Sequence, residues 1–421
     1  MNITSAIIYT NRLDIRDAVR QELKANGIQS SNIHNVRTLD EYKIAQNETG
    51  RSFQILDWEV NPEDILTILE ECRKKYKMET DPIFLVTATL GNDIMAVARE
   101  FHITHVHAGE LSRDIIQKEI RIMVGEIKKM EPIKQVFCRI EACYSQGKVD
   151  EAGTILEQIF RKTKDNPRVI ADLAENYIQR DKWDEAYELL SQMETVAKTD
   201  ARIKHLLAKC YLKQKLPTKA VDSLKDAQLI NPRNVERLLE LGHILLQDQP
   251  IEAKEKFNEI LDFAPQSKRG KMGKGSAMLL SGEVNEALKM LKDAVNSREL
   301  ASIFNTSAIL SIKTKKFESG LALYETACQT VEKNHRVLAK LLYNMGIGYV
   351  KWSKKEKGLE CFQKSLELDP SYADANYNIN AINKSLKQQS SLQEEKSTLE
   401  SLSHFEESKL SFNSDFEDDF D

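Results

Sequence analysis

Two oxygen-bearing side chains stand where short apolar runs end in the first hundred residues. Asp57 follows the run from Phe53 to Leu56, and Thr87 follows the run from Ile83 to Val86. Such runs, separated by amphipathic stretches, predict buried strands of a parallel sheet. Function in these sheets sits at the carboxyl ends of the strands. We therefore expect a carboxylate and a hydroxyl to lie at one edge of the sheet.

Other candidate chemistry in the chain is weaker. His102, His105 and His107 lie close together, but we interpret them as ordinary residues of a strand and its approach, and predict no metal site. The segment SKRGKMGKGS, residues 267–276, lacks the Gly-Lys-Ser/Thr ending of a phosphate-binding loop, and no strand precedes it. No catalytic triad, paired acids or zinc motif is evident, so the sequence predicts no enzyme and no cofactor.

The elements that would position Asp57 and Thr87 alternate between strand and helix patterns. The strands are expected at residues 6–9, 33–36, 53–56, 83–86 and 104–107, with helical spacing between them. This order predicts an α/β fold in which helices cover both faces of a five-stranded parallel sheet.

Two segments carry a resemblance to a known family. ILDWEV, which contains Asp57, resembles the phospho-acceptor segment of a response-regulator receiver (CheY-like) domain, and FLVTA, which contains Thr87, resembles its Thr/Ser–Ala step. The match covers roughly residues 3–129 and implies a doubly wound sheet. Receivers also supply two acids after the first strand and a lysine after the fifth. Here those positions are Thr10, Asn11 and Ala108.

These departures predict a degenerate receiver rather than a working one. Its vestigial site would consist of Asp57, Thr87 and Asn11, with Asp57 hydrogen-bonded in its loop and paired with Arg12. The alternative is a response regulator that is phosphorylated at Asp57 and so controls the rest of the chain. In that case Asn11 and Glu59 would lend the missing oxygens.

Internal periodicity dominates the remainder of the chain. Ala152, Ala186 and Ala220 are 34 residues apart, and each is followed four residues later by a leucine. The pattern resembles tetratricopeptide (TPR) repeats and continues, with slippage, for about seven units. The resemblance implies an all-α solenoid closed by a capping helix that ends near residue 388. The glycine-rich segment 267–276 would fall on the first helix of the fifth repeat.

The TPR resemblance also implies a peptide-binding groove lined by the first helices. Its positions in the third repeat are Arg202, His205, Lys209 and Lys213, and in the seventh Lys340, Tyr343, Ile347 and Lys351. These residues predict a basic groove that takes extended or acidic peptide segments. A solvated face with no partner is the alternative.

The tail, residues 389–421, combines ten acidic residues and two lysines with interspersed phenylalanines, among them Phe412, Phe416 and Phe420. Such a segment cannot form its own core and is typical of a disordered docking motif. We predict that it competes for the basic groove or docks on another protein. A plain solubilising tail is the alternative.

The sequence predicts three parts: a pseudo-receiver at 1–130, the repeats at 133–388 and the tail at 389–421. Six scattered cysteines, no secretory signal and no long apolar run favour a cytoplasmic protein without a membrane segment. The net charge of −5 and few aromatics disfavour nucleic-acid binding. The predicted function is that of a bacterial scaffold in signal transduction that binds other proteins.

Overall fold

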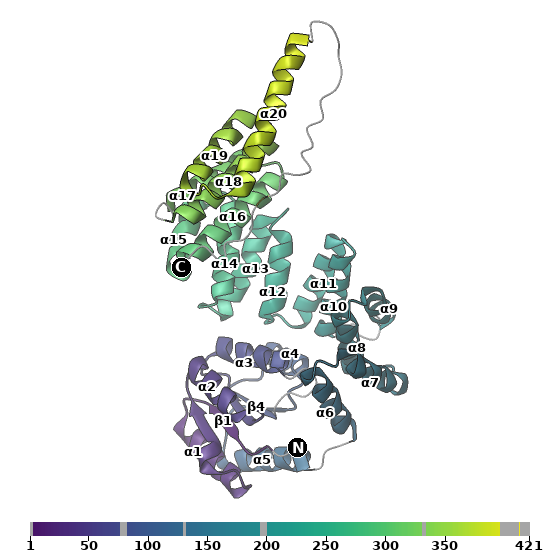
Figure 1. Cartoon of the computed structure of the whole chain (residues 1–421). Coiled ribbons are helices and arrows are strands. Elements are labelled where there is room, and N and C mark those ends of the chain that lie inside the picture. The colour runs from purple at the N-terminus through teal and green to yellow at the C-terminus, as the bar shows by residue number, and fades with distance from the viewer. Residues whose placement is uncertain are drawn as a thin grey trace. The chain divides into compact units, whose positions relative to one another are not determined.

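The computed structural model describes residues 3–75, 82–128, 132–193, 200–330, 334–395 and 412. It divides into two compact units, Met1–Leu238 and Leu239–Asp421 (Figure 1). The first unit holds a sheet domain and six helices of a helical array, and the second holds the rest of that array. Each unit is described by itself.

The sheet domain is a five-stranded parallel sheet with the strand order β2-β1-β3-β4-β5. The strands are β1 (Ala6–Tyr9), β2 (Ile33–Val36), β3 (Phe53–Asp57), β4 (Ile83–Thr87) and β5 (His105–Ala108). The helices are α1 (Leu13–Ala25), η1 (Ser30–Asn32), α2 (Leu39–Thr49), α3 (Pro62–Lys75), α4 (Asn92–Glu100) and α5 (Arg113–Lys128). Every residue of β1, β3 and β4 is buried, as their apolar runs predict.

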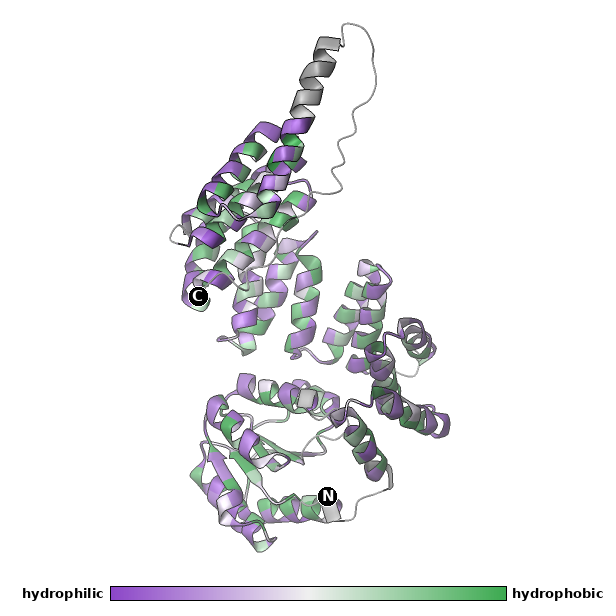
Figure 2. Cartoon of the chain, in the orientation of Figure 1, coloured by the Kyte–Doolittle hydropathy of each residue, from purple (hydrophilic) through white to green (hydrophobic). Residues whose placement is uncertain are grey.

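Helices lie on both faces of this sheet. Ile15 of α1 and Ile116 of α5 join Ile8 and Ile55 in one buried hydrophobic cluster. On the opposite face, the Tyr42 hydroxyl of α2 donates to Gln54 Oε1 of β3 over 2.7 Å. The expected α/β class is therefore confirmed, and hydrophobic segments run through the sheet (Figure 2).

The helical array consists of helix pairs. Its helices are α6 (Pro132–Ser145), α7 (Val149–Lys162), α8 (Pro167–Gln179), α9 (Trp183–Met193), α10 (Ala201–Lys213), α11 (Pro217–Ile230), α12 (Val235–Leu245), α13 (Pro250–Phe263), α14 (Lys268–Leu280), α15 (Val284–Ala294), α16 (Ser297–Lys313), α17 (Phe317–Thr330), α18 (His335–Lys351), α19 (Lys355–Leu368) and α20 (Ala373–Glu395). Within the described ranges they form seven pairs, each corresponding to one predicted repeat, and α20 stands in the capping position. This helix continues seven residues past the expected end at 388.

Small residues let the paired helices approach closely. The periodic alanines Ala152, Ala186 and Ala220 are fully buried, which confirms their predicted role. Gly273, inside the glycine-rich segment, lies on α14, where a Cβ atom would stand 2.2 Å from Cε1 of Phe257. The segment is thus part of the first helix of the fifth repeat, as expected, and its glycines serve helix packing.

Of the helices within the described residues, none combines the length and apolar character needed to span a membrane.

Candidate functional site

The carboxyl edge of the sheet brings together the residues that the sequence singled out. Asp57 ends β3 and is buried. Thr10, directly after β1, donates its hydroxyl to Asp57 Oδ2 over 2.6 Å. Arg12 donates from Nε to Asp57 Oδ2 over 3.0 Å and from Nη2 to Asp57 Oδ1 over 3.3 Å. The expected pairing of Asp57 with Arg12 is therefore present, and both carboxylate oxygens accept hydrogen bonds.

A second carboxylate at this edge is engaged in the same way. Glu59 Oε1 accepts the backbone N–H of Ala88 over 2.8 Å and the hydroxyl of Thr87 over 3.2 Å. Thr87 also donates to the carbonyl oxygen of Thr89, 3.0 Å away. The donors at the end of β4, the Thr87 hydroxyl and the Ala88 N–H, thus bind the Glu59 carboxylate. The sequence did not predict this contact.

The remaining positions of the edge supply no compensating charge. Ala108 is paired in register with Thr87 at the end of β5, where receivers carry the lysine. Gly109 follows with φ of +96°, in the left-handed region that favours glycine. Asn11 is exposed, and the hydrogen bonds to Asp57 within the described residues come from Thr10, Arg12 and the N–H of Glu59. Arg12 therefore supplies the positive charge that balances the Asp57 carboxylate.

His105 and His107, two of the three histidines expected to be ordinary residues, have protein partners. The two ring nitrogens of His105 face carboxylate oxygens of Glu119 and Glu126 at 3.2 and 3.3 Å. His107 Nε2 lies 3.1 Å from the carbonyl oxygen of Glu110. In the part of the chain that the structure describes, no three His, Cys, Asp or Glu side chains gather as a metal site would require.

The groove positions of the third repeat lie on α10, and the structure gives them different environments. The guanidinium of Arg202 is mostly buried and pairs with Asp172 and Glu175 of α8. Burial opposes ionisation of Glu175, but Arg202 and Arg73 outweigh it and lower its pKa to about 2. The charge of Arg202 is thus balanced inside the fold, which leaves less of it for a ligand than the sequence suggested.

The other three residues of this group lie further along α10. His205 and Lys209 are half-buried, as Arg202 is, and Lys213 is exposed. Lys213 lies 3.3 Å from Asp181 Oδ1, and its ammonium is 5.0 Å from the ring centroid of Trp183. Lys213 therefore remains partly available at the surface of α10.

The groove positions of the seventh repeat lie on α18. Tyr343 is buried, packs on Phe362 and Tyr372, and its hydroxyl accepts from Asn378 Nδ2 over 3.1 Å. It belongs to the hydrophobic core of the array rather than to an open groove. The repeat position alone did not reveal this, since the same position on a helix can face the core or the solvent. Lys340 is half-buried and Lys351 is exposed. The ammonium of Lys351 lies 5.7 Å from the ring centroid of Phe412 in the tail.

Of the predicted tail residues, Phe412 is the one that the structure places. It is half-buried and packs against two hydrophobic clusters of the second unit. Phe416 and Phe420 lie outside the described residues.

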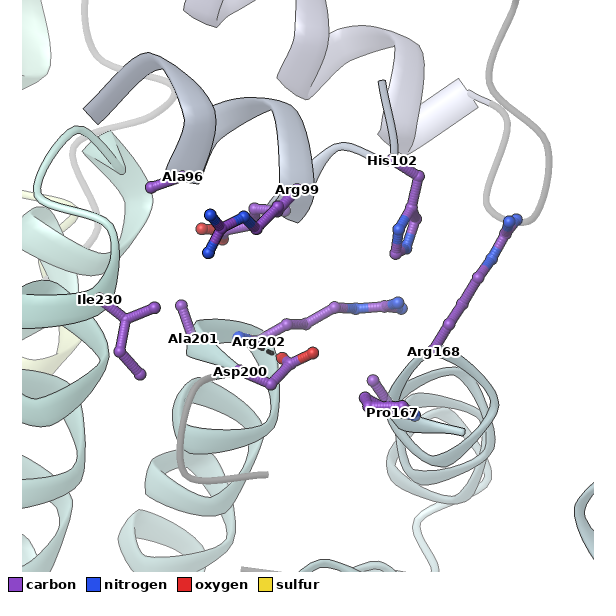
Figure 3. A pocket seen from close by; sticks show the side chains of 11 residues that line it. Ala96, Arg99, His102, Pro167, Arg168, Asp200, Ala201, Arg202 and Ile230 are labelled. Atoms are coloured by element: carbon purple, nitrogen blue, oxygen red, sulfur yellow. Dashed lines mark hydrogen bonds between the residues drawn. The ribbon is translucent and has the colours of Figure 1, made fainter. Parts of the chain in front are cut away.

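A pocket in the first unit was missed by sequence reasoning. Its cavity of about 230 Å³ is lined by Arg99 and His102 from α4 and its exit, and by Arg168, Asp200 and Arg202 from the array (Figure 3). His102 adopts a left-handed conformation, with φ of +56°. Burial, together with the positive charges of Arg168, Arg73 and Arg202, lowers the pKa of His102 to about 2. The imidazole is therefore neutral at pH 7.

Beside this pocket, Glu100 at the end of α4 joins the sheet domain to the array. Its carboxylate accepts from Asn231 Nδ2 over 2.5 Å, from Asn234 Nδ2 over 2.7 Å and from Arg237 Nη2 over 2.8 Å. Burial raises the pKa of Glu100, but Arg237 and these hydrogen bonds outweigh it, so the pKa lies below its usual value. A further ion pair joins Arg233 to Asp93 over 2.6 Å.

Comparison with known proteins identifies the helical part. Two family models described as tetratricopeptide repeat match residues 144–210 and 339–372. A curated relative, DnaJ homolog subfamily C member 3 of Gallus gallus, is 26% identical over 144 residues, which are 30% of this chain and 28% of that protein.

Solved structures are also similar to parts of this chain. MamA is 20% identical with a TM-score of 0.34, covering 37% of this chain and 91% of MamA. YrrB, described as a TPR protein with an unusual peptide-binding site, is 14% identical with a TM-score of 0.32, covering 53% of this chain and 96% of YrrB. A tetratricopeptide repeat protein from Parabacteroides merdae ATCC 43184 is 18% identical with a TM-score of 0.39, covering 59% and 97% of the two chains. The two family matches therefore identify tetratricopeptide repeats at residues 144–210 and 339–372 of the helical array.

Proposed function

We propose that this protein is a non-enzymatic adaptor of the bacterial cytoplasm, in which TPR repeats bind partner proteins and a receiver-like sheet domain has lost phosphoryl transfer. Proteins with TPR repeats are generally scaffolds for protein–protein interaction, which supports the first half of the proposal. The partners would be extended or acidic peptide segments.

One observation carries the second half: Asp57 is held on both oxygens by Arg12 and Thr10. A phosphoryl acceptor needs a free carboxylate oxygen and cations that neutralise the transferred group. Here Arg12 would have to leave Asp57 before a donor or Mg²⁺ could approach, and Glu59 occupies the donors at Thr87 and Ala88.

The second candidate is a phosphorylatable regulator. Two features favour it: the strand order β2-β1-β3-β4-β5, which occurs in flavodoxin-like and receiver proteins, and the placement of Asp57 at the end of the central strand. In that case phosphorylation of Asp57 would displace Arg12 and change what the repeats bind.

A mass measurement separates the two. The full chain is incubated with a small phospho-donor and Mg²⁺, and its intact mass is recorded beside that of Asp57→Asn. We expect no gain of one phosphoryl group in either protein. A stoichiometric gain that Asp57→Asn abolishes would replace the adaptor with the regulator. As a positive control, Thr10→Asp, Asn11→Asp, Arg12→Ala and Ala108→Lys together should improve Mg²⁺ binding.

A further inference from the structure

Phe412, the tail residue beyond Glu395 that the structure describes, contacts the repeats. Its ring packs against a first cluster that includes Ala308, Ile312 and Leu341, and against a second that includes Tyr343 and Ile347. Helix α18 contributes to both clusters. An aromatic side chain that packs against two clusters removes apolar surface of both from water, and this burial stabilises the contact.

Helix α18 also supplies the charge beside the ring. The exposed Lys351 ends α18 and places its ammonium 5.7 Å from the Phe412 centroid, within the range of a cation–π interaction. In the sequence, Phe412 is preceded by Glu406 and Glu407 and followed by four acids in residues 415–419. The positive charge of Lys351 is therefore opposite in sign to the acidic segment that carries the ring.

We propose that the surface of α18 around Lys351 is a binding site for an aromatic residue within an acidic peptide segment, and that the chain's own Phe412 occupies it. The inference rests on the proposed function, because the repeats would bind partners through the same surface. In the protein without a partner, the tail would then be bound to its own repeats. A partner with an aromatic residue in an acidic segment would have to displace Phe412.

Tethering makes this occupancy effective even if the contact is weak. A flexible linker gives the tail an effective concentration of about 1 mM at a site it can reach. If the free segment binds with a Kd of roughly 100 µM, the tethered tail weakens binding of a competitor by about tenfold.

The test uses the full chain and a fluorescently labelled peptide of residues 405–421. Phe412→Ala empties the site, so we expect it to bind the peptide about tenfold more tightly than the wild-type chain. Tyr377→Ala is the control, since it removes an exposed aromatic side chain of α20 that belongs to neither cluster, and it should bind like the wild type. Adding Lys351→Glu to Phe412→Ala should weaken binding by about fivefold, whereas adding Lys364→Glu on the exposed side of α19 should not.

Several results would overturn the inference. Equal affinity of the wild type and Phe412→Ala would show that the tail does not cover the site, and no binding by any variant would show that α18 is not such a site. Loss of a dimer in sedimentation of Phe412→Ala would assign the occupant to a second copy of the chain. None of these outcomes bears on Asp57, whose chemistry the mass measurement tests separately.

Discussion

At the residue scale, the carboxyl edge of the sheet shows how a side chain of the right type can be unavailable. The sequence predicted the position of Asp57 and its pairing with Arg12, because both follow from strand ends that lie next to each other. It did not predict that Glu59 accepts from Thr87 and Ala88. That contact depends on the conformation of the turn after β3, which no periodicity in the sequence encodes.

Arg12 should stabilise the fold through Asp57. Its side chain is 39% exposed while that of Asp57 is 2% exposed, so Arg12→Ala leaves a buried carboxylate without its cation. We expect a loss of about 1–2 kcal/mol in the free energy of unfolding, less than for a fully buried pair because water reaches Arg12. Urea denaturation measures this loss. Arg16→Ala leaves behind Asp17, whose side chain is 73% exposed and stays in water, so it should cost under about 0.5 kcal/mol, and an equal cost for both would refute the argument.

His102 should make stability depend on pH. Its pKa is about 2 in the folded chain, against the ordinary 6.5, so the unfolded chain takes up a proton first as the pH falls. The free energy of unfolding should therefore fall from pH 6.5 downward, by up to about 2 kcal/mol at pH 5, and be unaffected above pH 7.

The contribution of His102 can be isolated by difference. His102→Gln should flatten the decline between pH 7 and pH 5, as followed by urea denaturation at each pH. Parallel slopes for the wild type and His102→Gln would show that His102 titrates normally.

At the scale of elements, the sequence predicted most of the architecture. Apolar runs identified β1, β3 and β4, because burial on both faces leaves a continuous signal. β2 and β5 contain polar residues and followed from weaker patterns, with β5 displaced by one residue. The 34-residue spacing identified the repeats, because each must bury small residues between its two helices. Tyr343 and Arg202 were assigned to a groove from their positions alone. A position on a helix does not reveal which side chains the neighbouring helices cover.

Gly273 on α14 should resist substitution despite its cost to helix propensity. An alanine Cβ would stand 2.2 Å from Phe257 Cε1 and 2.4 Å from Phe257 Cδ1, and Phe257 is buried. We expect Gly273→Ala to destabilise the chain by about 1–3 kcal/mol, as overpacked cores do. Gly125→Ala on α5 is the control: its Cβ would meet nothing within 4 Å, so helix propensity should stabilise that variant by about 0.5–1 kcal/mol. Thermal melts of both variants would show shifts of opposite sign.

At the scale of the first unit, the contact between α4 and the repeats is the feature that sequence reasoning could least have found. Glu100 and Arg237 are 137 residues apart, and neither belongs to a motif. The sequence predicted a boundary near residue 131, between the sheet domain and the repeats. That boundary remains a prediction, and contacts group the sheet domain with the repeats up to Leu238. The sheet domain and the first repeats share buried charges at this contact.

Glu100 should therefore be a strong determinant of stability in the first unit. Arg237 is fully buried and Glu100 is its carboxylate partner, so Glu100→Ala leaves a guanidinium without a counter-charge in a site closed to water. We expect a loss of about 3–5 kcal/mol, because removing one member of a buried pair costs far more than the pair contributes. Asp93→Ala, also on α4, breaks a pair in which both side chains are about 30% exposed, and should cost under about 1 kcal/mol.

The double variant decides whether the cost comes from the stranded charge. Replacing both residues, Glu100→Ala with Arg237→Met, removes the uncompensated guanidinium and should recover at least half of the loss in urea denaturation. If the double variant is no more stable than Glu100→Ala, the loss comes from packing at α4 instead.

A chain truncated to residues 131–388 also lacks Glu100. It should keep its helices, but the amides of α8, α10 and α11 should exchange faster with deuterium than in the full chain, because Arg237 and Arg202 then lie next to water rather than α4. Unchanged exchange in those helices would mean that the sheet domain contributes nothing to the stability of the repeats it contacts.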